Sequence, residues 1–417
     1  MKKVNSLFFS QILRNNIYDE YGDVGKLWDI YVTNEELYPK AIGYIVKKNG
    51  EYFNYEFRNI DVYQNEENGK LKVLVKGVKD IIPRKYSYLL SKNLLNKQIV
   101  DINGKKLVRV NDLRLAELAG ELKVVAVDTS KLAFARRYKI EGIYKFISTI
   151  FNKKIEEALI IWDNVESIDL GEDLRLSVSY KKLSKLHPAD IADILEDMDS
   201  EYRHKVFESL EENLAADTLE EIEPEYQADI LESLSIAKTA EVLENMPNDE
   251  IADLLDEVDE KTKEKILINL EKGDADQVEA LLRYKDEEAG SLMNKDFISF
   301  DINITCEETI ELLRQLNPED EVAYYIYITE NEKLKGVVSL KDIILADKNR
   351  YLKDIMLTNV IRVRDNDSVE EAVDLAIKYN LLSLPLVDSE DKLTGIIVLS
   401  DIIDEVLLPV WKKKFRH

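Results

Sequence analysis

The stretch "KLKGVVSLKDII" at 333–344 returns almost unchanged as "KLTGIIVLSDII" at 392–403. Each copy has a basic start, a glycine, a short apolar run and then an Asp followed by two isoleucines. Period-two apolar runs bounded by glycine predict strands, and Asp near the start of an apolar run predicts a helix. We therefore expect one strand–turn–helix unit written twice, with Gly336 and Gly395 at the bends and Ser339 and Ser400 near the helix starts.

The surroundings of the two copies also match. Each is preceded by an amphipathic segment and then by a run typical of a strand, and Met293 and Met356 open the two copies. The predicted elements are helices at 306–316 ("CEETIELLRQL") and 368–379 ("SVEEAVDLAIKY"), and strands at 323–328 ("AYYIYI") and 382–388 ("LSLPLVD"). The order strand–helix–strand–strand–helix is thus predicted twice.

Bulk composition sets the class of protein. A chain of 417 residues with 45% hydrophobic residues is expected to form several globular domains. The single cysteine, Cys306, excludes an internal disulfide and favours a reducing compartment. The start "MKKVNSLFFSQILRNN" lacks the apolar core of a signal peptide, and no apolar run reaches the roughly 20 residues of a membrane helix. We expect a cytoplasmic protein, peripheral to a membrane at most.

The net charge of −25 is unevenly distributed. Acidic residues outnumber basic ones heavily over 187–290, whereas 1–186 is slightly basic. This balance argues against a protein that coats nucleic acid and favours cations or basic partners. It also permits the basic N-terminal part to dock on the acidic middle of the same chain.

That acidic middle carries a twelve-residue repeat. The motif apolar–apolar–x–x–apolar recurs as "ILEDM" (194), "VFESL" (206), "TLEEI" (218), "ILESL" (230), "VLENM" (242), "LLDEV" (254) and "ILINL" (266). Its spacing makes one apolar stripe on a helix, and twelve residues hold a helix of only about two turns. We predict stacked short helices, a small α-solenoid, with Pro188, Pro224 and Pro247 near helix starts and Thr218 as the imperfect stripe position.

The first third reads as strands and has a repeat of its own. The stretch "IYDEYGDVGKLWDIYV" at 17–32 is similar to "IVDINGKKLVRVNDLRL" at 99–115, with Asp19 and Asp101 suited to turn entry. This pattern resembles PRC-barrel domains and predicts a pair of small β-barrel-like units. No catalytic constellation occurs in them, and barrels of that family mostly serve contacts with protein or RNA.

The repeated unit around 333–344 and 392–403 resembles a tandem CBS pair, or Bateman module. Together with "LLRYKDEEAGSLMNKDFI" at 281–298 and the acidic repeat, it resembles the cytosolic region of MgtE-type magnesium transporters over about 183–408. The resemblance implies a multidomain α+β chain: PRC-barrel-like units at 1–85 and 86–182 (the second with a linker helix), an α-solenoid at 183–285, CBS repeats at 286–349 and 350–410, and a basic tail at 411–417. In that family a pore follows the CBS pair, and here the sequence stops at "VLLPVWKKKFRH".

The resemblance also implies a divalent-cation site. Magnesium prefers oxygen ligands, and scattered His187, His204 and His417 argue against zinc. Acids that face each other across the gap between solenoid and CBS pair would repel until Mg²⁺ screens them. The implied ligands are Asp217, Asp249, Asp253, Glu370, Glu371, Asp401 and Asp404. Four positions where the family tends to carry acids differ here: Ser368, Asn380, Ser400 and Pro409. The alternative is that these carboxylates are only a solvated helix face.

CBS pairs also often bind adenine nucleotides, so the resemblance implies ATP or AMP as a second ligand. The implied contacts are Asp342 with Ser339 to ribose, Tyr325 to the base, Lys341 to phosphate and Pro385 on the opposing strand end, with Ser400 and Asp401 in the second copy. Ser and Asp at a strand-to-helix junction are also ordinary helix caps, which need no ligand.

Three functions fit these observations. The first is a Mg²⁺-responsive regulator that acts on a separate membrane transporter, since no segment here is predicted to span a membrane. The second is a nucleotide-responsive regulator or adaptor acting on a protein partner, and the third is a scaffold without small ligands. The sequence contains no recognisable nucleophile–base set and no phosphate-binding loop, so no motif indicates an enzyme. We further expect a homodimer through the CBS pair, no nucleic acid partner, and a tail that is either solvated or in contact with anionic lipid.

Overall fold

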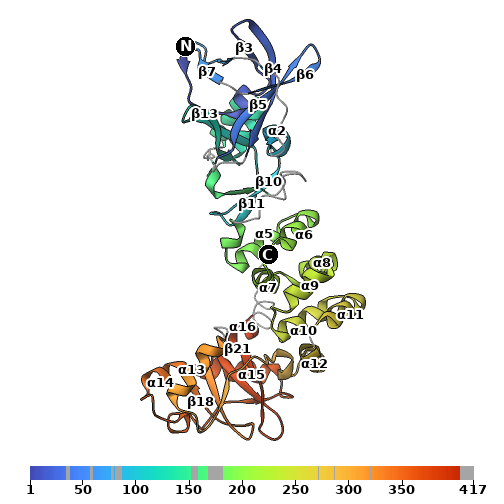
Figure 1. Cartoon of the computed structure of the whole chain (residues 1–417), viewed down its shortest axis with the longest axis vertical. Helices are drawn as coiled ribbons and strands as arrows, with labels where there is room; N and C mark the ends of the chain where they lie inside the picture. The colour runs from blue at the N-terminus through green and yellow to red at the C-terminus, as the bar shows by residue number, and fades with distance from the viewer. Residues whose placement is uncertain are drawn as a thin grey trace. The chain divides into compact units, whose positions relative to one another are not determined.

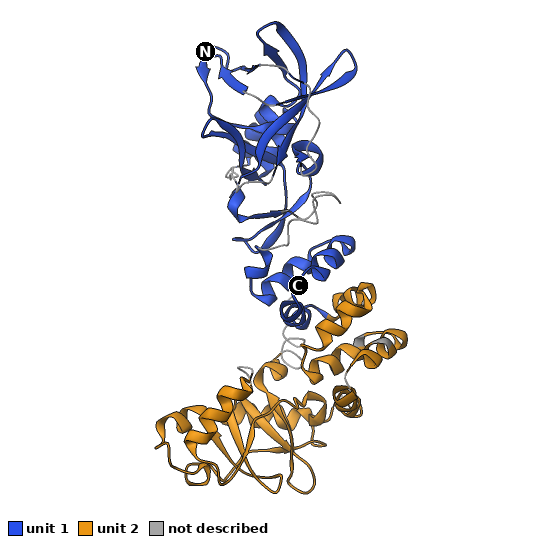
Figure 2. Ribbon diagram, viewed as in Figure 1, with its two compact units in different colours: residues 1–223 blue, residues 224–417 orange. Residues whose placement is uncertain are grey.

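The computed structural model describes residues 1–33, 38–56, 60–76, 79, 87–151, 158–167, 182–270, 272–285, 287–318 and 322–403, with side chains at 257 and 265 excepted. The predicted ligand Asp404 and the basic tail at 411–417 lie outside these residues. The chain divides into two compact bodies, residues 1–223 and residues 224–417 (Figure 2).

The first body begins with a mixed β-rich region. Its strands are β1 (Lys2–Lys3), β2 (Ser6–Phe8), β3 (Asn16–Asp19), β4 (Gly22–Thr33), β5 (Lys40–Lys48), β6 (Glu51–Glu56), β7 (Ile60–Gln64), β8 (Leu71–Val75), β9 (Ser87–Leu89), β10 (Gln98–Asp101), β11 (Lys106–Arg109), β12 (Asp112–Leu118), β13 (Glu121–Asp128), β14 (Leu159–Ile161) and β15 (Val165–Ser167). Its short helices are α1 (Phe9–Ile12), α2 (Leu90–Asn93), α3 (Lys131–Arg137), α4 (Glu141–Ile150), η1 (Trp162–Asn164) and η2 (Leu183–Lys185).

Most of these strands form one curled sheet (Figure 1). Its order is β1-β7-β8-β3-β4-β5-β13-β12-β2, with β6, β9 and β14 paired to β5, β4 and β13, and β11-β10-β15 form a smaller sheet. Val4 N donates to Val62 O of β7 at 2.8 Å, and Glu117 N of β12 donates to Asn5 O at 2.9 Å. Residues 4 and 5 therefore lie between the two ends of this strand order. The N-terminal part is therefore a curled sheet, whereas the predicted barrel geometry stays a prediction.

The two N-terminal copies share a single core and exchange their first elements. β2 of the first copy pairs with β12 of the second, and β9 of the second pairs with β4 of the first. A single apolar cluster runs from Leu7 to Val165 through both copies. The interpretation as two units side by side misses this exchange, while the predicted boundaries at 85 and 182 stay predictions.

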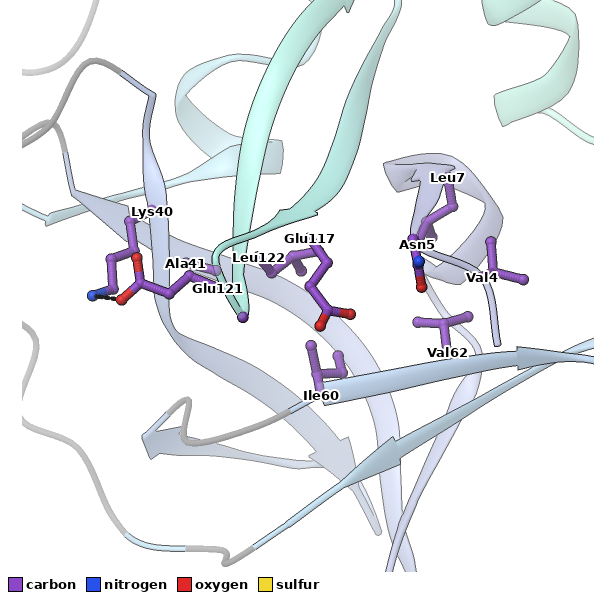
Figure 3. Close-up of a pocket in the computed structure, with 11 residues that line it drawn as sticks. Val4, Asn5, Leu7, Lys40, Ala41, Ile60, Val62, Glu117, Glu121 and Leu122 are labelled. Carbon is purple, nitrogen blue, oxygen red and sulfur yellow. Dashed lines mark ion pairs between the residues drawn. The ribbon is translucent and has the colours of Figure 1, made fainter. Parts of the chain in front are cut away.

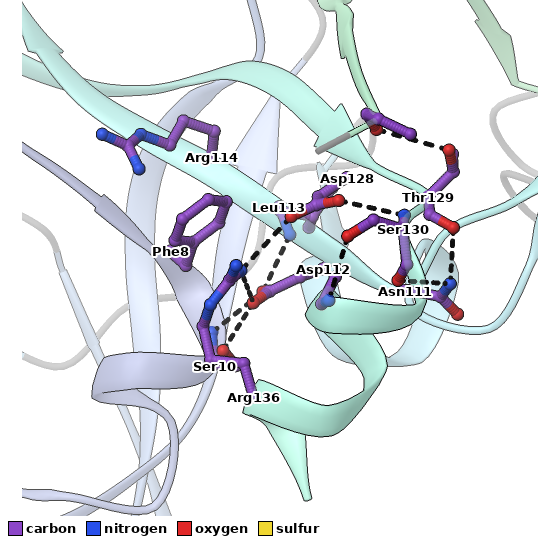
Figure 4. Close-up of polar contacts among 12 residues, drawn as sticks. Phe8, Ser10, Asn111, Asp112, Leu113, Arg114, Asp128, Thr129, Ser130 and Arg136 are labelled. Atoms are coloured by element: carbon purple, nitrogen blue, oxygen red, sulfur yellow. Dashed lines mark hydrogen bonds and ion pairs between the residues drawn. The ribbon is translucent and has the colours of Figure 1, made fainter. Parts of the chain in front are cut away.

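Buried polar groups join the exchanged elements. Ser10 Oγ donates to Asp112 Oδ2 at 2.5 Å, and in the mirror arrangement Ser91 Oγ donates to Asp29 Oδ2 at 2.7 Å. Burial raises the pKa of both carboxyls, and the hydrogen bonds from the serines oppose that rise. At Asp112 a cation is added, since Arg136 Nη1 lies 3.2 Å from Asp112 Oδ2 and 3.3 Å from Asp128 Oδ2 (Figure 4).

The acidic repeat folds into short helices whose starts follow one another every twelve residues. They are α5 (Pro188–Glu196), α6 (Ser200–Glu208), α7 (Glu212–Glu220), α8 (Pro224–Ser233), α9 (Ile236–Leu243), α10 (Asn248–Glu257), α11 (Glu260–Asn269) and α12 (Lys272–Leu281). Pro188 and Pro224 are the first helical residues and Pro247 precedes α10, which confirms the predicted prolines. Helices α5–α7 belong to the first body and α8–α12 to the second.

The predicted apolar stripe is the buried face of these helices. Ile194, Leu195 and Met198 are buried in α5 and just after it, and the corresponding positions are buried as far as Leu255, whereas Val258, Leu267 and Leu270 are half-buried. In the second body α8 packs on α10, α9 on α11 and α10 on α12, so each helix contacts the next but one. In the first body Lys105 Nζ lies 2.6 Å from Asp190 Oδ2, which places the β-rich region against α5. A complete solenoid across both bodies stays a prediction.

The CBS pair closes the second body with two copies of one small sheet. The first copy has η3 (Ala289–Leu292), β16 (Ser299–Asp301), α13 (Cys306–Leu316), β17 (Tyr325–Glu330), β18 (Lys333–Ser339) and α14 (Leu340–Leu345). The second has η4 (Leu352–Asp354), β19 (Val363–Arg364), α15 (Val369–Tyr379), β20 (Ser383–Val387), β21 (Leu393–Val398) and α16 (Leu399–Asp401). Each sheet pairs its first two strands in parallel and its last two antiparallel, which confirms the predicted duplication.

Gly336 and Gly395 lie inside β18 and β21, so their predicted place at bends is wrong. Each is glycine because a methionine sits where a Cβ would be: the added atom would lie 2.5 Å from Met356 Sδ and 2.3 Å from Met293 Cγ, respectively. Met293 opens the first copy but packs on the second, and Met356 opens the second but packs on the first. The two CBS copies therefore exchange their opening residues.

Candidate functional site

The link between α12 and the CBS pair is stabilised by the ring of Tyr284, which packs against Gly290. A Cβ on Gly290 would lie 2.4 Å from Tyr284 Cδ1, and Tyr284 Oη donates to Asp365 Oδ2 at 3.4 Å. Burial and then the Asp365 charge raise the pKa of Tyr284, so the hydroxyl stays a donor. Ala289 N and Gly290 N donate to Asp367 O and Asp365 O, each at 2.7 Å. The stretch "RYKDEEAG" is thus the attachment between helices and CBS pair.

Two carboxylates face the same junction. Desolvation raises the pKa of Asp296, at the start of the CBS pair, and repulsion from Asp274 of α12 raises it further. Asn248, the first residue of α10, donates through Nδ2 to Asp274 Oδ1 and to Gln277 Oε1, each at 3.4 Å. Carboxylate and amide oxygens are ligands that Mg²⁺ accepts, usually with only one or two carboxylates and several waters. Asp274, Gln277 and Asp296 therefore supply oxygen ligands of the type that a hydrated divalent cation accepts.

The predicted cation ligands are more dispersed. Asp217 lies exposed on α7 in the first body, and Asp253 is exposed on α10 with Asp249 half-buried one turn before it. Glu370 and Glu371 are exposed in the first turn of α15, and Asp401 ends α16 with its carboxylate 3.4 Å from Val398 N. Among the described residues, no three Asp, Glu, His or Cys side chains gather as a metal centre. The predicted ligand set is therefore not assembled here, and its role stays a prediction.

Two departures from the family's acidic positions have structural reasons. Ser368 is the N-cap of α15 and its Oγ accepts from Glu371 N at 3.2 Å. Asn380 ends the same helix with a left-handed backbone, φ 52°, which asparagine adopts more readily than most residues. Both positions serve the helix ends in this chain.

The predicted nucleotide residues of the first CBS copy do come together. Tyr325 of β17 pairs with Ser339 of β18, Ser339 Oγ donates to Asp342 Oδ2 at 2.6 Å, and Lys341 Nζ lies 3.9 Å from Asp342 Oδ1. Ser339 is also the N-cap of α14, accepting from Asp342 N at 3.2 Å, as the alternative interpretation predicts. Pro385 is buried within β20, opposite Ile396 of β21.

The second CBS copy lacks the corresponding hydroxyl. Val398 occupies the strand end that Ser339 occupies in the first copy, and Asp401 follows it at the same spacing. A single polar cluster of this kind therefore lies on the first copy, within the described part of the pair. The sequence indicated this difference, because Ser339 aligns with Val398 in the two quoted stretches.

A cavity of about 150 Å³ lies in the first body (Figure 3). Its wall combines β1–β2, β5, β7 and the β12–β13 turn. Its charged residues are already paired: Lys40 with Glu121, and Glu117 with Lys3 at 2.9 Å. None of the predicted site residues lines it, and its paired charges give it no evident chemistry.

Asp274 and Asp296 are the candidate site residues that sequence reasoning missed. They are 22 positions apart. Asp296 lies within the quoted stretch 281–298, but no quoted motif contains Asp274 or pairs the two residues. Their electrostatic interaction joins α12 to the entrance of the CBS pair and is tertiary, so no local pattern encodes it. The only available signal was the acidity of the whole stretch.

Comparison with known families and structures agrees with this architecture. The MgtE intracellular N domain matches residues 186–287, and the CBS domain matches 289–349 and 352–408. The magnesium transporter MgtE of Thermus thermophilus is 40% identical over 129 residues, covering 31% of this chain and 29% of that protein. The same transporter of Enterococcus faecalis is 34% identical over 32% of this chain and 30% of its own length. The chain thus spans under a third of these relatives.

Two solved structures are similar over more of the chain. The cytosolic domain of the Mg²⁺ channel MgtE in complex with ATP has 34% identity and a TM-score of 0.53, covering 56% of this chain and 94% of that one. The soluble part of a magnesium transporter has 30% identity and a TM-score of 0.52, covering 54% and 90%. Among the described residues no helix is both long and apolar enough to cross a bilayer. The chain belongs to the family of MgtE cytosolic regulatory regions, with an N domain followed by a CBS pair.

Proposed function

We propose that this chain is a regulatory module whose helical repeat and CBS pair respond to Mg²⁺. The observation that carries the proposal is the pair of like charges at their junction, Asp274 on α12 and Asp296 on the CBS side. The Asp274 charge opposes ionisation of Asp296, so the compact junction carries an electrostatic cost at neutral pH. A divalent cation between them would turn that repulsion into attraction.

The response follows from linkage. A cation that binds only when Asp274 and Asp296 are close stabilises the compact junction by its own binding free energy. Asn248 and Gln277 offer amide oxygens beside Asp274, and water completes the coordination shell of Mg²⁺. The dispersed acids Asp217, Asp249, Asp253, Glu370, Glu371, Asp401 and Asp404 would add weaker screening. Removal of the cation loosens the helices from the CBS pair.

The proposed partner is a membrane transporter, because the relatives named above are magnesium transporters and their matched regions are cytosolic. In this proposal the module acts on that separate protein from the cytoplasmic side. A homodimer through the CBS pair belongs to the same proposal, and light scattering of the purified chain measures it.

Small-angle scattering across a magnesium titration tests the proposal. We expect the radius of gyration to fall as Mg²⁺ is added and to rise again on chelation. Asp274→Asn with Asp296→Asn should leave the radius small in both conditions, since the repulsion is gone. The matched control is Glu311→Gln with Asp374→Asn, which removes two exposed acids of α13 and α15 that belong to no predicted ligand set. A radius that is the same with Mg²⁺ and with chelator in the unaltered chain rejects the proposal.

A nucleotide site in the first CBS copy is the second candidate. It is favoured by the contact of Ser339 with Asp342 opposite Tyr325, and the similar cytosolic domain was solved with ATP. Calorimetry with ATP, ADP and AMP, with and without Mg²⁺, separates it from the first. Ser339→Val copies the residue of the second repeat and should weaken binding, whereas Asp401→Asn should not. Heat with nucleotide alone favours this candidate, and heat with Mg²⁺ alone favours the first.

A further inference from the structure

Helix α4 carries an apolar face that points away from the protein. Ile143, Phe146, Ile150 and the following Phe151 are 62%, 68%, 61% and 69% exposed. The same surface continues onto α3 and its loop through Phe134, Tyr138 and Ile140, which are also exposed. Soluble proteins seldom expose so many neighbouring large apolar side chains without an interaction partner.

The opposite face of α4 is polar, and only part of it is buried. Ser148 is the buried residue of this helix, at 7% exposure, and Glu141 and Lys145 form an ion pair at 2.6 Å on the polar side. At 100° per residue, Ile143, Phe146, Ile147 and Ile150 make one stripe and Glu141, Lys145 and Ser148 make the other. The helix is therefore inverted relative to an ordinary surface helix, whose apolar stripe faces the core.

The inverted helix is held in place by its neighbour. Arg136 of α3 contacts Asp112 and Asp128 in the buried network, and its guanidinium lies 3.5 Å from the centre of the Phe8 ring (Figure 4). Helix α3 packs on α4. The apolar face is thus presented by an anchored element.

The border of this face is basic in a chain that is strongly acidic. Between residues 131 and 151, Glu141 is the single acidic residue against Lys131, Arg136, Arg137, Lys139 and Lys145. Arg136 is paired internally and Lys145 lies on the opposite, polar side of α4, whereas Lys131 and Lys139 are exposed. An apolar stripe with basic residues at its border is the pattern of helices that lie in the surface of an anionic membrane.

We propose that α3 and α4 dock this protein on an anionic lipid surface, with the apolar stripe of α4 among the acyl chains and Lys131 and Lys139 near the headgroups. A second copy is a poorer occupant, because a two-fold contact places the same basic border against itself. An acidic protein groove fits the charges but is not needed to explain a stripe this broad and aromatic. The site is separate from the Mg²⁺ junction and would orient the module on the membrane.

Co-sedimentation of the full chain with vesicles tests the proposal. We compare phosphatidylcholine vesicles with vesicles that also contain phosphatidylglycerol, at low and high salt. Binding should require the anionic lipid and weaken with salt, since exposed charges are screened. Phe146→Ser with Ile150→Ser should lower the partition coefficient about tenfold or more, because two large apolar side chains no longer enter the bilayer.

Matched variants keep the result specific. Ile268→Ser with Leu345→Ser removes two equally exposed apolar residues, 80% and 76% exposed, from α11 and α14 and should bind vesicles unchanged. Lys131→Glu with Lys139→Glu should remove the preference for anionic lipid. An environment-sensitive reporter, Phe146→Trp, should shift its emission to the blue only with anionic vesicles.

Three outcomes overturn the proposal. These are a folded chain that binds neither vesicle type, binding that the Phe146 and Ile150 double variant retains, or a dimer that this variant dissociates while vesicles have no effect. The last outcome identifies a second copy as the occupant.

Discussion

Two regions of this molecule contain paired copies that exchange their opening elements, and they join those copies by different chemistry. In the N-terminal sheet the exchanged contacts are buried and polar: Ser10 to Asp112 and Ser91 to Asp29. In the CBS pair they are apolar: Met293 on Gly395 and Met356 on Gly336. The same topology is thus stabilised by hydrogen bonds to buried carboxylates in one region and by close packing in the other.

The difference determines what each region tolerates. A buried carboxylate must keep all its donors, because a group left unsatisfied bears the full cost of desolvation. A methionine on a glycine needs only shape, and a flexible thioether can move when its neighbour has room. We therefore expect single substitutions to damage the N-terminal exchange most, and the CBS exchange according to how tightly each methionine is enclosed.

The largest effect is expected for Asp112→Ala. Asp112 accepts hydrogen bonds from Ser10, Leu113 and Arg136, and its loss leaves the buried Arg136 with Asp128 alone. Removing one partner of a buried ion pair costs about 3–5 kcal/mol. Urea unfolding read by hydrogen exchange of amides in β12 and β4 measures the loss in each copy.

Asp29→Ala is the matched variant in the other copy. Asp29 accepts from Ile30 and Ser91, and among the described contacts no arginine donates to it. Its loss should cost less, about 1–3 kcal/mol, because no buried cation is left behind. Equal losses at the two positions would show that Arg136 contributes nothing and that the copies are energetically alike.

The CBS exchange is tested next by Gly395→Ala and Gly336→Ala. The new Cβ at 395 meets Met293, which is fully buried, and also lies 2.8 Å from the backbone oxygen of Asn294. At 336 its three nearest atoms all belong to Met356, which is half-buried and can swing aside. Overpacking costs about 1–3 kcal/mol, so Gly395→Ala should approach the upper value and Gly336→Ala the lower. Thermal unfolding measures both.

A second substitution identifies the cause. Met293→Ala added to Gly395→Ala should recover part of the lost stability. Met356→Ala added to Gly336→Ala should recover none of it and should only add its own destabilisation. If the two glycine variants lose the same stability, the enclosure of the methionines does not control the exchange.

The exchanges also show how much of the structure could be predicted from the sequence. The twelve-residue period and the duplicated CBS motif are local patterns, so the helices from Pro188 onward and the helix at 306–316 could be predicted closely. Ser10 and Asp29 occur in one copy, and Ser91 and Asp112 in the other, so the sequence gives no sign that partners cross over. The same holds for Asp274 and Asp296, whose approach depends on packing between elements. Patterns in sequence report local structure, whereas these contacts are tertiary.

A smaller effect is expected for a polar contact between the CBS copies. Tyr327 Oη and Ser383 Oγ lie 2.7 Å apart, and both residues are buried. Tyr327→Phe leaves the Ser383 hydroxyl without this partner and should cost about 1–2 kcal/mol. Adding Ser383→Ala removes the orphaned group and should restore most of the loss. A double variant less stable than the single one would mean that packing around Tyr327, and not its hydroxyl, joins the copies.

The smallest effect is expected at Asp296. Among the described contacts its carboxylate accepts no hydrogen bonds like those that serve Asp29 and Asp112. Asp296 has a pKa raised first by desolvation and then by repulsion from Asp274. Because its pKa in the folded state lies above the unfolded value, its charge destabilises the fold as pH rises through the unfolded value near 4 towards the raised one. Below that range the carboxyl is neutral in both states and the penalty disappears.

Asp296→Asn should therefore raise the unfolding temperature at neutral pH, by a free energy below about 1 kcal/mol since the side chain is exposed. The gain should vanish on acidification through the same range, and Mg²⁺ should reduce it by screening the unaltered carboxylate. Asp374→Asn on the exposed face of α15 serves as the control and should show neither dependence. If Asp296→Asn is neutral at every pH, the junction acids are ordinary surface charges, and the contrast with the satisfied carboxylates of the N-terminal sheet does not hold.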